Sequence, residues 1–459
     1  MHKILCLLFT IIYHSTILSI SPAENKLKSV SGAKTKKALS RQQSRLNKAL
    51  FRTVQKYLNP KPVLNGNDSA AKAEKAKLLT RIKDLLNKKA NPKTKLNGLS
   101  ITDIRDSDGH TLVHQIVKNG QTIKNGMIQE LELLLVTGAN IEAKNNKGNT
   151  PTHLAAYYGD VAALAKLHEL GADIHARDNN GNALVHYAAF KGRVASFAKL
   201  HEWGADINAR DIHGSSPAHL AAAEGQADMV TKLHEFGANI NAKDNTDETP
   251  AHYAALNGKV TVLAKLHELG TDMNARDKNG SRPAHFAAEK GRAGVIKKLH
   301  ELDVDMNAKD NNDDTPIHWA IFHGQAVVLA TLLKLGVNMN ARDKNGNTPA
   351  HLAARLKSED AFHVLISSGA RVNVKNKFGQ SLVHLVAQNE YFDRAEMFKK
   401  LYQAGANMDA QDNRGRTPID MAQQCNFKET AELLRQMQEF KNMGFEGDFY
   451  QTSDEAACK

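Results

Sequence analysis

Apolar and polar positions follow one repeating order from about residue 103 to residue 440. A short Ala- and Leu-rich stretch is followed by glycine, a second apolar stretch and a polar turn of the form Asp-x-x-Gly. A histidine marks each unit and recurs at steps of 33 residues. These histidines are His153, His186, His219, His252, His285, His318, His351 and His384. Such a fixed period predicts one small structural unit stacked many times.

Each unit predicts two short helices and a turn. Pro151 suits a first helical turn, where its missing N–H costs no hydrogen bond, and the preceding Thr150 suits a helix cap. Gly159 ends the first helix, and Gly171 supplies a left-handed cap for the second. Residues 178–181, Asp-Asn-Asn-Gly, then turn the chain. We therefore expect an all-α fold in which no unit buries its apolar face alone.

The block Asn-Thr-Pro-Thr-His-Leu-Ala-Ala at 149–156 returns in similar form at 248–255 and 347–354. It resembles the ankyrin repeat, which has a period of 33 and the fingerprint Thr-Pro-Leu-His-x-Ala. The resemblance covers residues 103–440, about ten repeats. It implies an ankyrin-repeat solenoid of helix–turn–helix units joined by β-hairpin-like turns. It also implies that the recurring histidines are structural and form hydrogen bonds within and between repeats.

Several positions depart from the family pattern. Asp247 and Asp313 replace the turn glycine, and Asp tolerates a left-handed backbone better than most residues do. Asp420 takes the place of the recurring histidine. Extra residues within 119–130 and near 389–398 predict longer loops.

The formal charge of +12 is unevenly distributed. Residues 21–100 contain 20 Lys and Arg against four acidic residues, so the rest of the chain is mildly acidic. Apolar stripes at helical spacing, the first running from Leu39 to Tyr57, predict a basic helical segment over 24–102 that caps the first repeat. Residues 441–459 have no periodicity and predict a disordered tail. The segment 26–95 could contact nucleic acid or an anionic membrane, but a solvated basic face is the preferred explanation of its charge.

The first residues have the form of an export signal. A short basic start precedes the apolar residues 4–20, and Ser21 and Ala23 fit a cut before Glu24. We expect residues 1–23 to be a signal peptide, with an uncleaved membrane anchor through residues 4–20 as the alternative. An exported ankyrin protein resembles the effectors that intracellular bacteria deliver into hosts.

A second histidine row lies near the end of the second helix of five repeats. It consists of His168, His201, His234, His267 and His300. Duplication of one unit with a packed, half-buried histidine explains the row best. A pH-sensitive stripe is the functional alternative, because histidine titrates near pH 6.5.

The family resemblance places a partner surface on the turn tips and the ends of the first helices, which line a concave groove. Aromatic, aliphatic and basic residues there are candidate partner contacts. The candidates are Tyr157, Tyr158, Phe190, Ile212, His213, Leu256, Lys278, Phe322, Lys344, Lys377 and Phe378. Some of these side chains could instead pack against their neighbours, as we expect Trp319 to do in a core leucine position.

No phosphate loop, Gly-x-Ser-x-Gly, His-Glu-x-x-His or Cys-x-x-Cys motif is present. We therefore expect a monomeric, non-enzymatic scaffold that binds a protein and uses no cofactor, metal or small-molecule substrate. Polyanion binding through 26–95 and a purely structural scaffold are the alternatives.

Overall fold

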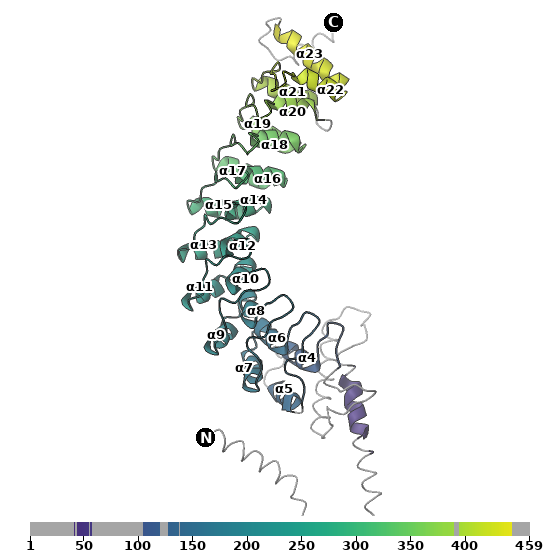
Figure 1. Cartoon of the computed structure of the whole chain (residues 1–459), viewed down its shortest axis with the longest axis vertical. Coiled ribbons are helices and arrows are strands. Elements are labelled where there is room, and N and C mark those ends of the chain that lie inside the picture. The colour runs from purple at the N-terminus through teal and green to yellow at the C-terminus, as the bar shows by residue number, and fades with distance from the viewer. Residues whose placement is uncertain are drawn as a thin grey trace, which may run out of the picture. The chain divides into compact units, whose positions relative to one another are not determined.

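A computed structural model describes residues 41, 44–54, 56, 104–119, 127–136, 138–389 and 394–442. The chain divides into two compact units, Met1–Asn146 and Lys147–Lys459. Every regular element of the described residues is a helix (Figure 1), and the turns add one isolated β-bridge between Arg177 and Ala183. This agrees with the all-α class predicted from the sequence.

The first unit contains the first repeat. Helix α4 (Leu112–Asn119) packs against α5 (Met127–Val136). Upstream, residues 44–54 are helical, and Leu50 and Val54 are completely buried. These two residues belong to the apolar stripe that predicts a helix in this segment.

The described residues of the second unit form nine successive helix pairs. The pairs are α6 (Pro151–Tyr158) with α7 (Val161–Glu169), α8 (Leu184–Phe190) with α9 (Val194–Glu202), α10 (Pro217–Glu224) with α11 (Ala227–Glu235), α12 (Pro250–Leu256) with α13 (Val260–Glu268), α14 (Pro283–Glu289) with α15 (Ala293–Glu301), α16 (Pro316–Phe322) with α17 (Ala326–Lys334), α18 (Pro349–Arg355) with α19 (Glu359–Ser367), α20 (Leu382–Ala387) with α21 (Arg394–Gln403), and α22 (Pro418–Gln424) with α23 (Lys428–Asn442). We call the even-numbered helices of this unit inner and the odd-numbered helices outer.

The core of the second unit is built from equivalent residues of successive repeats. Inner helices pack on inner helices and outer helices on outer ones. Alanines such as Ala221 and Ala254 are completely buried between inner helices, where their small side chains allow close approach. Leucines such as Leu233 and Leu266 fill the corresponding space of the outer helices. Because each repeat supplies only part of this core, the repeats stabilise one another.

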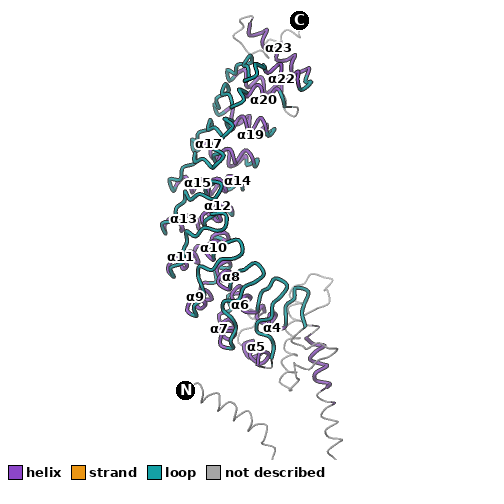
Figure 2. The backbone as a smooth tube through the Cα atoms, in the orientation of Figure 1, coloured by secondary structure: helices purple, strands orange, loops and turns teal. Residues whose placement is uncertain are grey.

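The turns also follow one another along the unit (Figure 2). Within a turn, the backbone N–H of Asp244 donates to Glu248, and between turns that of Asn245 donates to His213. The turn requires a left-handed residue, which is usually glycine. Asp247 and Asp313 adopt that conformation, with φ of 65° and 61°, as predicted.

Candidate protein-binding surface

The recurring histidine joins its own helix to the next repeat. In α12, Nδ1 of His252 accepts the backbone N–H of Thr249 at 3.1 Å, and the Thr249 hydroxyl lies 2.9 Å from the same nitrogen. Because Nδ1 accepts an N–H, the ring proton is on Nε2, which donates to the carbonyl of Ser281 at 3.2 Å. The threonine hydroxyl therefore donates to the ring, and Thr249 is the N-cap of α12 in a capping box with His252, as the sequence predicts.

Six other rings repeat the backbone and carbonyl contacts, with Nε2–O distances of 3.0–3.3 Å. They are His153, His186, His219, His285, His351 and His384. His318 keeps the contact at its helix start, while its Nε2 has no partner. The row thus links neighbouring repeats and presents no free nitrogen pair to a ligand.

Burial also determines the charge of this row. Burial lowers the pKa of His252, His318 and His351 to about 4, against smaller opposing effects from hydrogen bonds and nearby carboxylates. These rings are therefore neutral at pH 7. A neutral ring is what the contacts require, because Nδ1 must accept the backbone N–H.

The turn aspartates orient aromatic side chains in alternate repeats. Oδ1 of Asp178 accepts the backbone N–H groups of Asn180 and Asn182, and Oδ2 accepts the Tyr187 hydroxyl at 2.7 Å. Burial and the neighbouring carboxylate raise the pKa of Tyr187, so it remains a donor. The pairs Tyr253–Asp244 and Trp319–Asp310 repeat this contact at 2.8 and 3.1 Å. Trp319 is thus half-buried and hydrogen-bonded.

Tyr157, Tyr187 and Phe190 form the wall of a pocket of about 310 Å³. The Tyr157 ring centroid lies 6.4 Å from Phe190, nearly parallel to it, and 6.2 Å from Tyr187. The remaining lining residues are Asn180, Asn182, His186, Asp211, His213 and Leu220. We call this site the aromatic pocket. It brings together three candidates predicted from the sequence, Tyr157, Phe190 and His213.

A lysine that the sequence analysis did not select lies beside the aromatic pocket. Nζ of Lys191 is 5.2 Å from the Tyr157 ring centroid and 4.8 Å from that of Phe190. These distances are within the range of a cation–π interaction. The pocket therefore combines apolar walls with a positive charge at one side.

A side chain of the next repeat also holds the backbone of the pocket residue Tyr157. Nε of Arg193 donates to the carbonyl of Tyr157 at 3.3 Å. Gly159, at the end of α6, allows this approach, because a Cβ there would lie 2.7 Å from the Arg193 side chain. Its left-handed φ of 77° also suits glycine.

The other candidates lie on other parts of the repeats. Tyr158 is half-buried against Tyr157, at 5.1 Å between ring centroids, and Leu256 is half-buried at the end of α12. The exposed candidates are Ile212, Lys278, Phe322, Lys344, Lys377 and Phe378. The structure does not bring these residues into the aromatic pocket.

The second histidine row divides into packed and exposed members. His168 stacks on Trp203 of the next repeat at 4.2 Å between ring centroids, and His201 lies 4.9 Å from Phe236. Both histidines are half-buried, whereas His234, His267 and His300 are exposed. The duplication hypothesis predicts that all five histidines are half-buried, and the structure shows this for two of them.

An exposed cation stands immediately before the turn aspartate, or its equivalent asparagine, in seven successive turns of the second unit. These cations are Arg177, Arg210, Lys243, Arg276, Lys309, Arg342 and Lys375. Arg177, for example, donates to the carbonyl of Arg210 in the next repeat at 2.7 Å. The 33-residue spacing of these cations is visible in the sequence alone.

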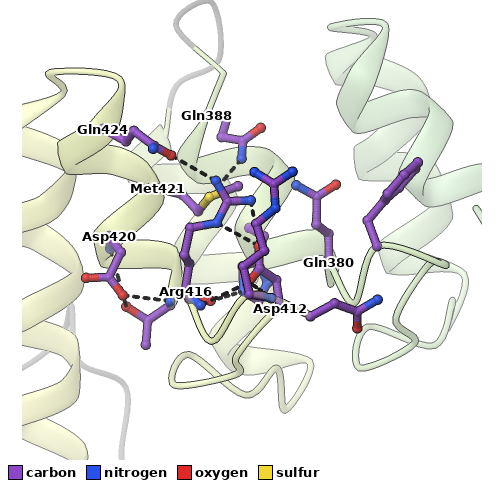
Figure 3. A network of polar contacts seen from close by, with 12 residues as sticks. Gln380, Gln388, Asp412, Arg416, Asp420, Met421 and Gln424 are labelled. Atoms are coloured by element: carbon purple, nitrogen blue, oxygen red, sulfur yellow. Dashed lines mark hydrogen bonds and ion pairs between the residues drawn. The ribbon is translucent and has the colours of Figure 1, made fainter.

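The last described repeat closes with a polar network (Figure 3). The Arg416 guanidinium contacts Asp412 at 2.7 and 2.9 Å and Gln424 at 2.9 Å. Asp420, in the histidine position, accepts the N–H and hydroxyl of Thr417 at 2.8 and 2.7 Å. Its contacts therefore remain within its own helix start.

One group of side chains in the described residues has the spacing of metal ligands. Asp106, Asp108 and His110 place ligand atoms within 4.8 Å of one another in the first unit. Oδ1 of Asp106 already accepts the backbone N–H groups of Asp108 and His110. Its Oδ2 lies 3.2 Å from Nδ1 of His110. These contacts are explained by a turn of the same kind as those in the second unit.

No helix among the described residues combines the length and apolar character needed to cross a membrane. The expected signal peptide or anchor, most of the basic segment and residues 443–459 lie outside the described residues.

Comparison with known proteins assigns the repeats to a family. The sequence model for ankyrin repeats, in three copies, matches residues 70–178, 121–211, 185–277, 218–310, 284–376 and 351–443. No curated protein matches the chain. Among solved structures, the chain is similar to the crystal structure of the human ASB11 ankyrin repeat domain. The two are 28% identical over 47% of this chain and 97% of that chain, with a TM-score of 0.42. Because the family matches extend over most of the sequence, the chain belongs to the ankyrin-repeat family.

Proposed function

We propose that this chain is a non-enzymatic scaffold that binds a partner protein through its inner helices and turns. Ankyrin repeats are modules for protein–protein interaction, which gives the general class of function. The aromatic pocket is the observation that supports this particular surface. Its walls come from two adjacent inner helices and its polar rim from the turns.

The pocket has the properties of an interface anchor point. Aromatic side chains contribute disproportionately to binding when they are held in fixed orientations, and Tyr187 is held by Asp178 at 2.7 Å. The volume of about 310 Å³ accommodates one large side chain of a partner. Lys191 favours a partner with an acidic residue beside that side chain.

Affinity capture with the full chain tests the proposal. The double variant Tyr157→Ala and Phe190→Ala removes two pocket walls, while Val327→Ala removes an exposed apolar side chain from outer helix α17. We expect a captured protein to be lost with the double variant and retained with Val327→Ala. Circular dichroism would establish that both variants are folded.

Equal capture by both variants would contradict the pocket assignment and favour another surface or a structural scaffold. Capture of polyanions alone, with a steep salt dependence, would instead favour the basic segment 26–95.

We further propose that the chain is an exported effector and that residues 1–23 direct its export. The basic start, the apolar stretch and the small residues before Glu24 support this proposal. Mass spectrometry of protein recovered outside producing cells would give the new N-terminus. Export with cleavage before Glu24 is the expected result, and retention of the intact N-terminus in the membrane would favour an anchor.

A further inference from the structure

The repeat period places a second surface with related chemistry five repeats after the aromatic pocket. A shift of 165 residues converts Tyr157, Phe190 and His213 into Phe322, Arg355 and Phe378. The stacking of equivalent helices makes these positions equivalent in space as well as in sequence. We define the distal surface as Phe322, Arg355, Phe378 and the neighbouring turn residues Lys344 and Lys377.

The distal surface exposes large apolar side chains next to cations. Phe378 is 60% exposed and Phe322 is 46% exposed. Lys344, Arg355 and Lys377 are also exposed. Burial of an aromatic ring against a partner removes apolar surface from water, which lowers the free energy. An occupant with aromatic and acidic side chains would therefore match this surface.

The two central residues of each turn in the second unit carry no negative charge, while Asp247 and Asp313 take the left-handed position of two turns and face Lys243 and Lys309. The two residues after each turn aspartate, or after its equivalent asparagine, include Lys278, Lys344, Lys377 and Arg414. None of the residues at these two positions is acidic in the turns from 178 to 415. An acidic segment that lies along these tips meets cations at several of them.

Residues 443–459 have the complementary composition. They contain Phe445, Phe449 and Tyr450, together with four acidic residues and a single lysine. Aromatic and acidic residues alternate closely over 445–450, in the order Phe-Glu-Gly-Asp-Phe-Tyr. This is the chemistry that the distal surface favours.

The position of α23 brings this segment within reach. In earlier repeats the outer helix leads toward the next turn, as α19 ends at Ser367 and is followed by Phe378 at a tip. Helix α23 is six residues longer than α19 and ends at Asn442, and its Gln438 contacts Asp409, three residues before Asp412 of the last turn. Stacked helices are about 10 Å apart, and eight extended residues span about 27 Å. Phe449 and Tyr450 can therefore reach the Phe378 turn, whereas the aromatic pocket is too many repeats away.

We propose that residues 443–459 bind the distal surface of their own chain. Phe449 and Tyr450 contact Phe378, and the acidic side chains face Lys344 and Lys377. This proposal rests on the proposed binding function. A partner protein that binds the distal surface would have to compete with residues 443–459 of the same chain.

Hydrogen–deuterium exchange on the full chain tests the contact. The variant Phe449→Ala with Tyr450→Ala should increase deuterium uptake at 376–380 and leave 211–215 unchanged. Phe378→Ala should increase uptake within 443–459, whereas Ile212→Ala, an equally exposed tip residue outside the segment's reach, should not. Ile212 is 58% exposed, so both substitutions remove a similar exposed group.

A synthetic peptide of residues 443–459 provides an independent measurement by fluorescence anisotropy. It should bind the Phe449→Ala, Tyr450→Ala chain at least about tenfold more tightly than the same chain carrying Phe378→Ala. Higher salt should weaken the binding.

Unchanged exchange in the segment variant, or equal peptide binding to both chains, would overturn the proposal. Protection of 376–380 that rises with protein concentration would also overturn it, because the segment would then bind a second copy. These outcomes are separable from failure of the proposed function, since Phe378 lies outside the aromatic pocket and partner capture depends on Tyr157 and Phe190.

Discussion

His252 and Ser281 belong to adjacent repeats, and Nε2 of the histidine donates to the serine carbonyl at 3.2 Å. Replacing His252 by Ala removes this link, leaves the N–H of Thr249 without its acceptor and opens a cavity. We expect a loss of about 3 kcal/mol in the free energy of unfolding, measured by urea denaturation. His234→Ala, at an exposed position, should change it by less than about 0.5 kcal/mol. Equal losses would contradict the structural role of the buried row.

Acidification should destabilise the repeats. His252, His318 and His351 have a pKa of about 4 in the folded chain, and histidine in an unfolded chain has a pKa of about 6.5. The unfolded state therefore binds more protons between these values. The stabilisation is complete above pH 6.5 and is lost as the pH falls toward 4, by on the order of 3 kcal/mol per ring. Thermal unfolding from pH 8 to pH 4 would measure the effect, and a constant midpoint would contradict it.

Asp314 should be replaceable by Asn with a gain in stability. Burial and the nearby carboxylates, chiefly Asp310, raise the pKa of Asp314 to about 7. In the next repeat, Asn347 at the equivalent position donates its amide to Asp343 at 2.9 Å. Asp314→Asn should therefore stabilise the chain at pH 8 by roughly 2 kcal/mol.

The pH dependence of this gain has a defined sign. A carboxyl with a raised pKa in the folded state stabilises it in the protonated form, and this contribution is lost as the pH rises through 7. The advantage of Asp314→Asn should thus shrink as the pH falls toward 4. The reverse change, Asn347→Asp, should lower stability at pH 8. A gain from Asp314→Asn that is independent of pH would contradict the assignment.

Two glycines with similar backbone conformation should differ in their tolerance of alanine. Gly204 and Gly214 have φ of 89° and 80°, so both substitutions strain the backbone. A Cβ at Gly204 meets nothing within 4 Å, whereas one at Gly214 would lie 2.7 Å from the backbone nitrogen of Asn245. We expect a loss of about 1 kcal/mol for Gly204→Ala and at least about twice that for Gly214→Ala, measured by urea denaturation. Equal losses would show that the turn can move away.

The helix pairs could be predicted from the sequence because their causes are local. Pro151 sets the start of α6, Gly159 its end, and the 33-residue period repeats both. The left-handed backbone of Asp247 also followed from the turn pattern. The helix-cap position of Thr249 was predicted as well, whereas the contact of its hydroxyl with His252 depends on the rotamer of the ring.

The aromatic pocket could be predicted only in part. Tyr157 and Phe190 occupy the same position of adjacent repeats, so their proximity follows from the period. The orientation of Tyr187 depends on a side-chain hydrogen bond to Asp178, and the position of Lys191 depends on the rings beneath it. Such contacts arise from packing between repeats. The period predicts which positions are neighbours, but it does not determine the side-chain conformations.

In every member of the histidine row except His318, the imidazole N–H donates to a backbone carbonyl of the repeat that follows. A cut between two such repeats would therefore be asymmetric, because the piece before the cut ends with a buried donor that has lost its acceptor. Asp420 changes this situation. Both of its contacts are to Thr417, so the final described repeat has no N–H at this position that needs a carbonyl beyond it. Replacing Asp420 by histidine would add an N–H that needs such a carbonyl. An aspartate at the histidine position of an earlier repeat would make a point at which the array could be divided with little loss of stability.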